Sequence, residues 1–297
     1  MNLSTFDLLK NASSEGGFTL TDDQLRLLQQ TLLEMLADLH TLAEANGIRL
    51  HLAGGALLGA VRDGNMIPWD DDIDLHIARS DYAHFLSLLR EQRSDRYWLH
   101  TPETTHEYGI LSVRVRLQGT DVRQREDSYS DECGVTVDLF PVENTYDDAL
   151  RRLLHGLLCM GAGFLLSCRK FRRDRKNLKP LLQTSASGRQ AFRIKNAVGF
   201  LVSWADVDAW THFTVKVYSL CRNENSVLVS VPAGRNHYFR EMYRRSDLLS
   251  DCKLPFANGI YYCTADPDDY LTKMYGDYRQ IPPPEKREHH IYYSFEL

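Results

Sequence analysis

Apolar residues recur along the chain with two spacings, and these spacings predict its first helices and strands. Between Leu25 and Leu39, leucines stand three or four positions apart, which is the spacing of one buried helix face. Thr21 and Gln24 predict a capping box at the start of that helix. Residues 48–52 alternate between apolar and polar side chains, so they predict a half-buried strand directly after the helix.

Shorter elements are predicted further along the first half of the chain. The alternation of residues 72–77 indicates a strand, and Ser80 can cap a helix over residues 82–91. We expect three more short strands after this helix, at residues 98–100, 110–117 and 120–123.

The middle of the chain is predominantly helical by its pattern. A helix that begins near Asn144 or Thr145 becomes unusually apolar over residues 153–168. Residues 183–189 are polar and predict a loop, and residues 207–222 predict another helix.

The last third of the chain returns to mixed structure. Strands are predicted at residues 227–231 and 260–264. Asp266 and Pro267 suit the N-cap and first position of a helix over residues 268–275. The Pro-rich, polar end that follows is expected to be extended.

Composition narrows the class of protein. The 297 residues are 43% hydrophobic and 25% charged, as in a soluble globular protein with a large core. The net charge of -5 offers no global basic surface for a nucleic-acid partner. Six scattered cysteines without a C-x-x-C pair favour reduced thiols over disulfides or zinc. The N-terminus lacks a secretory h-region, and no uninterrupted apolar run approaches about 20 residues, so we expect a cytoplasmic protein.

Four carboxylates within five positions are the strongest chemical signal in the sequence. Asp70, Asp71, Asp72 and Asp74 repel one another unless cations neutralise them. On a strand, Asp72 and Asp74 would share one face while the apolar residues occupy the other. Two carboxylates that project together from a buried strand can coordinate a divalent metal. We therefore predict a metal-dependent phosphate site, with Asp71 as a bystander.

Two further motifs fit phosphate chemistry. Gly54 and Gly55 open a short helix, and the N–H groups at a helix N-terminus favour an anion such as phosphate. Arg114 and Arg116 alternate with valines, so their guanidinium groups share one strand face. That geometry suits phosphate oxygens, and it equally suits a solvated edge strand.

Asp138 interrupts an apolar strand around residues 134–141. A buried acid is costly unless it is paired or bound to a ligand. Asp138 is therefore either a third carboxylate of the metal site or a strand-end cap or salt-bridge partner.

The order of these motifs resembles that of the LicD family, which includes bacterial phosphorylcholine transferases and fukutin-related ribitol-phosphate transferases. The resemblance rests on the G-G-A-L-L-G-A-V-R segment at 54–62, I-P-W-D-D-D-I-D at 67–74, and V-D-L-F-P at 137–141. It rests also on D-Y-L…M-Y-G-D-Y at 269–278 and the three prolines at 282–284.

The resemblance implies an α+β fold, with a nucleotidyltransferase core of the DNA polymerase β type and a helical insertion. By position, Asp72 and Asp74 would hold divalent metal, either Mg²⁺ or Mn²⁺. Asp138 would be the third carboxylate, as a metal ligand or as the base for the acceptor hydroxyl. The implied substrate-binding positions are Gly54, Gly55, Arg62, Asp70, Arg114 and Arg116.

Three regions are expected from the resemblance and the pattern together. Residues 1–145 would form the catalytic core, after a loose lead-in that ends near residue 18. Residues 146–226 would be a mainly helical insertion that faces the acceptor or a membrane, and residues 227–297 would return to the core.

The implied reaction moves a phospho-alcohol group, phosphocholine above all, from a CDP-alcohol to a hydroxyl of a glycan precursor and releases CMP. The glycan would belong to lipopolysaccharide, teichoic acid or capsule, and it could be lipid-linked. Two alternatives stay open. One is a nucleotidyltransferase that moves NMP from an NTP to a sugar or small molecule, and the other is a non-catalytic nucleotide- or metal-binding module.

Residues 153–179 join an apolar helix to a dense basic run. This pattern is typical of a segment that lies on an anionic membrane, and it also fits a core helix with a solvated basic end. The first interpretation would place the protein peripherally at the inner face of the membrane.

Overall fold

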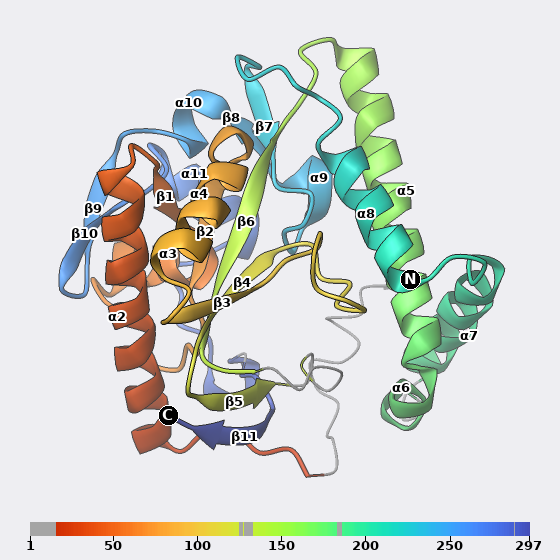
Figure 1. Ribbon diagram of the computed structural model, residues 1–297, viewed down its shortest axis with the longest axis horizontal. Coiled ribbons are helices and arrows are strands. Elements are labelled where there is room, and N and C mark those ends of the chain that lie inside the picture. The colour runs from red at the N-terminus through yellow and green to blue at the C-terminus, as the bar shows by residue number, and fades with distance from the viewer. Residues whose placement is uncertain (1–15, 125–126, 128–132, 183–185, 288) are drawn as a thin grey trace.

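The computed structural model describes residues 16–124, 127, 133–182, 186–287 and 289–297, and the structural statements below concern these residues. They form an α+β fold in which helices lie along one large mixed sheet, as predicted (Figure 1). A further group of helices extends from one end of the molecule (Figure 1). Most of the predicted lead-in falls outside the described residues.

The large sheet has the strand order β3-β4-β6-β2-β1-β10-β9, while β7 pairs with the last residues of β6 and β8 pairs with β7. Strand β2 is parallel to β6, whereas β4 is antiparallel to β6 and β1 is antiparallel to β2. The strands are β1 (Leu50–Leu52), β2 (Asp74–Ala78), β3 (Tyr97–His100), β4 (Val113–Leu117), β6 (Thr136–Asn144), β7 (Leu228–Ser230), β8 (Met242–Arg244), β9 (Lys253–Phe256) and β10 (Gly259–Tyr262).

Helix α2 (Asp22–Ala45) begins at the capping box that the sequence predicts. The Gln24 N–H donates to Thr21 Oγ1 at 3.3 Å, and the Thr21 N–H donates to Gln24 Oε1 at 3.0 Å. The predicted apolar face is buried in the main core through Leu28, Leu32, Leu36 and Leu39. Helix α3 (Gly54–Arg62) follows β1 directly, as predicted.

Two predictions around β2 are wrong. Helix α4 (Arg79–Gln92) has Ala78 as its N-cap, so Ser80 lies inside the first turn and does not cap it. The strand begins only at Asp74, and Asp72 lies in the loop that leads into it. Helix α4 therefore starts directly after β2 at a residue that makes no side-chain cap hydrogen bond.

The predicted start of the long apolar helix is also wrong. Helix α5 (Ala149–Arg173) is capped by Asp148, whose side chain accepts a hydrogen bond from the Arg151 N–H at 2.8 Å. Asn144 is the last residue of β6, and Thr145 follows it with its hydroxyl bonded to a backbone carbonyl. Asn144 thus belongs to β6 and Thr145 is bonded to β7, so neither residue caps α5.

Four helices form the end of the molecule that projects from the sheet (Figure 1). They are α5, α6 (Arg175–Leu182), α7 (Ala186–Leu201) and α8 (Val207–Tyr218). Helix α7 corrects the loop predicted at residues 183–189, of which 183–185 lie outside the described residues. Three of its four buried residues are small: Gly188, Ala191 and Gly199. At Gly199 an added Cβ would collide with the Cys168 carbonyl of α5. Small residues pack closely without an apolar periodicity, so the spacing gave no helix signal.

This helical end has small cores of its own, separate from the main core under the sheet. One joins α5 to the end of α8 through Cys159, Val217 and Tyr218, and another joins Leu166 to Trp210. By length and composition, α5 is the one described helix that could cross a membrane, and 28% of its most apolar window is buried.

The C-terminal part returns to the sheet and then runs along the core. Helix α11 (Pro267–Tyr275) starts as predicted, because the Asp266 side chain accepts the Asp269 N–H at 3.0 Å. The Pro-rich segment predicted to be extended, residues 275–290, is only partly so, because Pro284–Lys286 form the 3-10 turn η2. Strand β11 (Tyr292–Glu296) follows it and pairs antiparallel with β5 (Asp121–Gln124) in a separate two-stranded sheet. Three short helical turns complete the chain: α9 (His237–Arg240), α10 (Arg245–Leu248) and η2 (Pro284–Lys286).

Candidate active site

The pairing of three strands places Asp74, Asp138 and Arg114 in one row across the sheet. Asp74 on β2 is paired with Asp138 on β6, and Asp138 is paired with Arg114 on β4. Paired residues on neighbouring strands project from the same face. The Arg114 Nε lies 3.3 Å from Asp138 Oδ1, so the row contains an ion pair.

The two glycines at the start of α3 make room for carboxylates. A Cβ on Gly54 would lie 2.8 Å from Asp74 Oδ2, and one on Gly55 would collide with Asp70 Oδ2. Gly54 also has a φ of +49°, and its N–H donates to the Tyr270 hydroxyl at 3.1 Å. The acids therefore lie against the first turn of α3, where the helix dipole favours negative charge.

Burial and mutual repulsion change the proton affinity of these acids. Burial first, and then the negative charge of Asp72, raise the pKa of both Asp70 and Asp74 well above the usual range. Burial also raises the pKa of Asp72 to about 6. Carboxyl groups of this kind ionise readily only when positive charge comes near them.

Asp71 has protein partners from the end of the chain, and sequence reasoning missed them. His290 Nδ1 lies 2.7 Å from Asp71 Oδ1, and the Tyr292 hydroxyl donates to Asp71 Oδ2 at 2.8 Å. Although burial alone would raise it, the charge of His290 and the hydrogen bonds hold the pKa of Asp71 below its usual value. Asp71 therefore anchors the C-terminal segment beside the acids. In the sequence, His289 and His290 stand next to each other in a polar segment, but nothing there indicates that either contacts Asp71.

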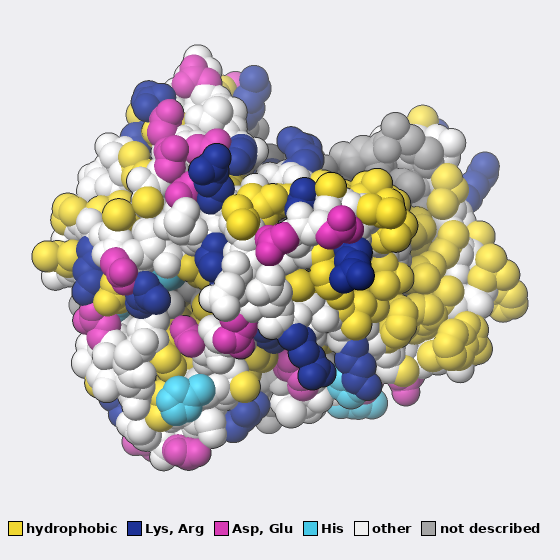
Figure 2. Space-filling view, turned by 90° about the horizontal axis from the view of Figure 1, so that it is seen from above, with side chains coloured by type: hydrophobic (Ala, Val, Ile, Leu, Met, Phe, Trp, Pro, Cys, Tyr) yellow, Lys and Arg dark blue, Asp and Glu magenta, His cyan; other side chains and the backbone are white. Residues whose placement is uncertain are grey.

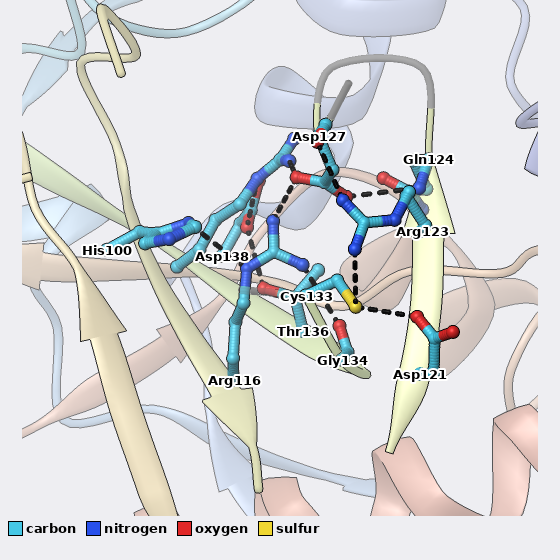
Figure 3. A network of polar contacts seen from close by, with 11 residues as sticks. His100, Arg116, Asp121, Arg123, Gln124, Asp127, Cys133, Gly134, Thr136 and Asp138 are labelled. Carbon is cyan, nitrogen blue, oxygen red and sulfur yellow. Dashed lines mark hydrogen bonds and ion pairs between the residues drawn. The ribbon is translucent and has the colours of Figure 1, made fainter. Parts of the chain in front are cut away.

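Arg116 lies beside the row, in a buried polar network (Figure 3). Its side chain is fully buried, and its guanidinium forms an ion pair with Asp127 and donates to the Gly134 carbonyl at 3.0 Å. Asp127 also lies 3.3 Å from Arg114 Nη1, so it holds both arginines. The structure thus directs Arg116 towards Asp127, whereas the sequence suggested a phosphate contact.

Arg62 lies at the end of α3, apart from the row. Its guanidinium contacts Asp63, with Nη2 2.9 Å from Oδ2, and lies 5.6 Å from the centre of the Trp69 ring. Arg287, from the C-terminal segment, lies 4.1 Å from the centre of the same ring. Trp69 thus joins α3 to the C-terminal segment next to Asp70.

The acids can hold a cation in more than one way. In the described part of the chain, Asp71, Asp72 and His290 form the one trio of such side chains whose ligand atoms lie within 4.8 Å of one another. The predicted trio of Asp72, Asp74 and Asp138 does not meet that criterion: Asp74 and Asp138 are paired across β2 and β6, whereas Asp72 lies in the loop before β2. The negative charges of Asp72 and Asp138 nevertheless raise the pKa of Asp74, after burial as the larger cause. The oxygen donors of this trio suit Mg²⁺ or Mn²⁺.

Tyr275, at the end of α11, is a further group that borders the acids. Although 37% of the residue is exposed, desolvation of its hydroxyl group, followed by the charges of Asp70 and Asp74, raises its pKa above the usual range. Its place in the M-Y-G-D-Y segment was noted from the sequence, but nothing there indicated that it faces the acids. Fold and site together define an α+β protein with a convergent carboxylate site beside an arginine.

Comparison with known proteins identifies the family. Residues 47–192 match the family described as LicD/FKTN/FKRP, nucleotidyltransferase domain. Over 287 residues, the chain is 24% identical to the lipopolysaccharide cholinephosphotransferase LicD of Haemophilus influenzae, covering 92% of this chain and 98% of that protein. Residues 47–192 therefore belong to the LicD family, and the chain as a whole is similar to LicD over nearly its full length.

Two shorter matches agree with this assignment. Human ribitol 5-phosphate transferase FKRP is 47% identical over 60 residues, which is 20% of this chain and 11% of that protein. An uncharacterized protein of Rickettsia typhi, RT0683, is 41% identical over 59 residues, covering 20% of this chain and 19% of that protein.

Proposed function

We propose that this protein transfers a phospho-alcohol group, with phosphocholine favoured, from a CDP-alcohol to a hydroxyl of a cell-surface glycan precursor and releases CMP. The observation that carries the proposal is the row of Asp74, Asp138 and Arg114, with Asp70 and Asp72 crowded beside it. The near full-length match to a cholinephosphotransferase supports the choice of group. The core would be a nucleotidyltransferase of the DNA polymerase β type.

The residues present fit a divalent cation. Burial and repulsion raise the pKa of Asp70 and Asp74, so the positive charge of Arg114, which pairs with Asp138, does not offset the charge of these acids. The donors that the cluster offers are carboxylate oxygens. Asp72, Asp74 and Asp138 would hold the ion, which we take to be Mg²⁺ or Mn²⁺. When bound, such an ion neutralises the diphosphate and the charge that develops on the entering and leaving oxygens.

The protein's own groups then have distinct tasks. Asp138 accepts the proton of the acceptor hydroxyl, whose oxygen forms the new bond to phosphorus. The bond between that phosphorus and the bridging oxygen breaks, and CMP leaves with the electron pair. Arg114 fixes the Asp138 carboxyl through its 3.3 Å contact. Gly54 and Gly55 would receive the anionic donor only once a cation has neutralised Asp70 and Asp74, which lie against them.

The deciding experiment incubates the full chain with Mg²⁺ or Mn²⁺, a simple glycan, and CDP-choline, CDP-ethanolamine, CDP-glycerol or CDP-ribitol. Mass spectrometry should find CMP and a glycan carrying one phospho-alcohol. Asp74→Asn and Asp138→Asn should lower the rate by about 10²-fold or more, because each removes a charge from the reacting site. The exposed Asp251, changed to Asn, is the matched control.

Other outcomes would point to the two alternatives. Release of pyrophosphate from CTP or another NTP, with NMP on the product, would identify a nucleotidyltransferase. Nucleotide binding without any product, and with unchanged behaviour of Asp74→Asn, would identify a non-catalytic module. Because the donors are cytoplasmic nucleotides, we place the reaction in the cytoplasm, with a lipid-linked glycan as the acceptor.

A further inference from the structure

Helix α5 is apolar on two sides, and one of these sides has no covering element among the described residues. Its inner side carries His155, Cys159 and Leu166, which are buried against α8 and its surroundings. Its outer side exposes leucines at helical spacing, with Leu150 exposed by 64% and Leu157 by 55%. The leucines of the outer side are Leu150, Leu153, Leu154, Leu157 and Leu158. A stripe of this regularity is usually covered by another apolar surface.

A second apolar group stands where α7 ends and α8 begins. Phe200, Leu201 and Trp204 are all exposed, Trp204 by 80%. The Arg172 guanidinium lies 5.5 Å from the centre of the Phe200 ring, so a cation borders the group. Figure 2 shows apolar side chains spread over this end of the molecule, with Lys and Arg side chains at the border. We call the five leucines and these three residues the apolar face.

The charge of the chain is divided unevenly around this face. Residues 149–201 contain twelve Lys and Arg and a single acid, Asp174, which gives a formal charge of +11. The whole chain carries -5, so the remaining residues carry -16. The apolar face is therefore carried by the one strongly basic part of an acidic protein.

We propose that the apolar face and its basic border bind the surface of an anionic membrane. Leucine and tryptophan side chains enter the boundary between headgroups and acyl chains, while Lys and Arg contact anionic headgroups. Trp204 suits that boundary because indole combines an apolar ring with a polar N–H. The surface differs from the predicted 153–179 segment, because it starts at Leu150 and includes the turn between α7 and α8.

Charge and packing exclude two other occupants of the face. A second copy of the chain would bring two segments with a formal charge of +11 together, and like charges repel. Membrane spanning would pull α5 away from partners it needs: His155 Nε2 lies 2.8 Å from the Val217 carbonyl, and Gly156 and Gly199 allow close contact with neighbouring groups. A helix that lies in the membrane surface keeps those contacts.

The test measures flotation of the purified full chain with two kinds of vesicle, phosphatidylcholine alone and phosphatidylcholine mixed with phosphatidylglycerol. No donor or acceptor is present, so failure here leaves the proposed reaction untouched. We expect binding to the mixed vesicles at least about tenfold stronger than to the neutral ones, and weaker as salt is raised.

Matched variants separate the apolar and basic contributions. Leu154→Glu with Leu157→Glu should lower binding by about tenfold or more, whereas Ile260→Glu, at an exposed apolar residue of β10, should leave it unchanged. Lys176→Glu with Lys179→Glu should weaken binding to anionic vesicles only. Arg90→Glu with Arg244→Glu makes the same change of net charge on exposed residues elsewhere.

Circular dichroism of each variant checks that it has folded. The proposal is overturned if the folded wild-type chain floats with neither vesicle, or if the double leucine variant floats as well as the wild type. It is also overturned if light scattering shows a dimer that the double leucine variant abolishes, with no vesicle binding.

Discussion

Four neighbouring aspartates have the same side chain and different roles in this structure. Asp70 and Asp74 lie against the first turn of α3, whereas Asp71 is held by His290 and Tyr292. The sequence shows that acids gather here, because their density is visible in the chain itself. It cannot separate their roles, because the partners of Asp71 are more than 200 residues away.

Gly55→Ala tests the close packing of Asp70 on α3. The added methyl group would collide with Asp70 Oδ2 and displace the carboxyl, so we expect CMP release to fall by up to about 10²-fold. Gly161→Ala is the control, because its Cβ meets nothing and should stabilise α5 by about 0.5–1 kcal/mol. Activity of Gly55→Ala equal to that of the wild type would contradict this account.

Because of Glu241, the stability of the folded protein should depend on pH. Glu241 is buried, accepts the Asn236 N–H at 2.5 Å, and burial raises its pKa to about 7 from the usual 4.5. Between these two pKa values the folded chain keeps a proton that the unfolded chain loses. The contribution of Glu241 to the free energy of unfolding is therefore complete below about pH 4.5 and is lost as the pH rises towards 7.

Glu241→Gln mimics the protonated acid, so its Tm should exceed that of the wild type increasingly as the pH rises from 5 to about 8. Thermal unfolding across this range measures the difference. The exposed Glu285, changed to Gln, should follow the wild type at every pH. Parallel curves for Glu241→Gln and the wild type would rule out this role.

Whole elements were predictable where their signals are local. Helix α2 and helix α11 begin at side chains that cap them within three residues, and both starts were predicted from the sequence. Helix α5 had several polar residues before it, and only the structure shows that β6 uses Asn144. Helix α7 packs through small residues, which leave no apolar spacing to detect.

The cap of α5 can be tested directly. Asp148→Ala removes the acceptor of the Arg151 N–H and should lower the free energy of unfolding by about 1 kcal/mol. Asp148→Ser is the control, because serine accepts the same hydrogen bond. Urea denaturation of the three proteins measures the effect, and equal stability of Asp148→Ala and Asp148→Ser would refute it.

At the scale of the whole molecule, the fold class was predictable from the sequence, but the assembly of the candidate site was not. The α+β class and the acidic motif follow from spacing and residue type, which are local. The row of Asp74, Asp138 and Arg114 depends on strand order and register, whereas the pattern of residues predicted only the individual strands. The contact of the C-terminal segment with Asp71 had no local signal at all.

A divalent cation should stabilise the entire fold, because it would bind the repelling carboxyls only in the folded chain. We expect Mg²⁺ or Mn²⁺ to raise the Tm by several degrees over that in a chelator, and Asp74→Asn to remove most of the gain. Asp251→Asn should behave as the wild type. A Tm that is the same with chelator and with either ion would contradict the expectation.

The contact between Tyr292 and Asp71 also bears on how the chain folds. These residues are 221 positions apart, and contacts of such separation close slowly because a long loop must be ordered first. During synthesis, the glycine and aspartate motifs leave the ribosome long before the segment that holds Asp71 in place. The acidic cluster should therefore reach its final geometry late, and in refolding the signal of the sheet should return before the activity does.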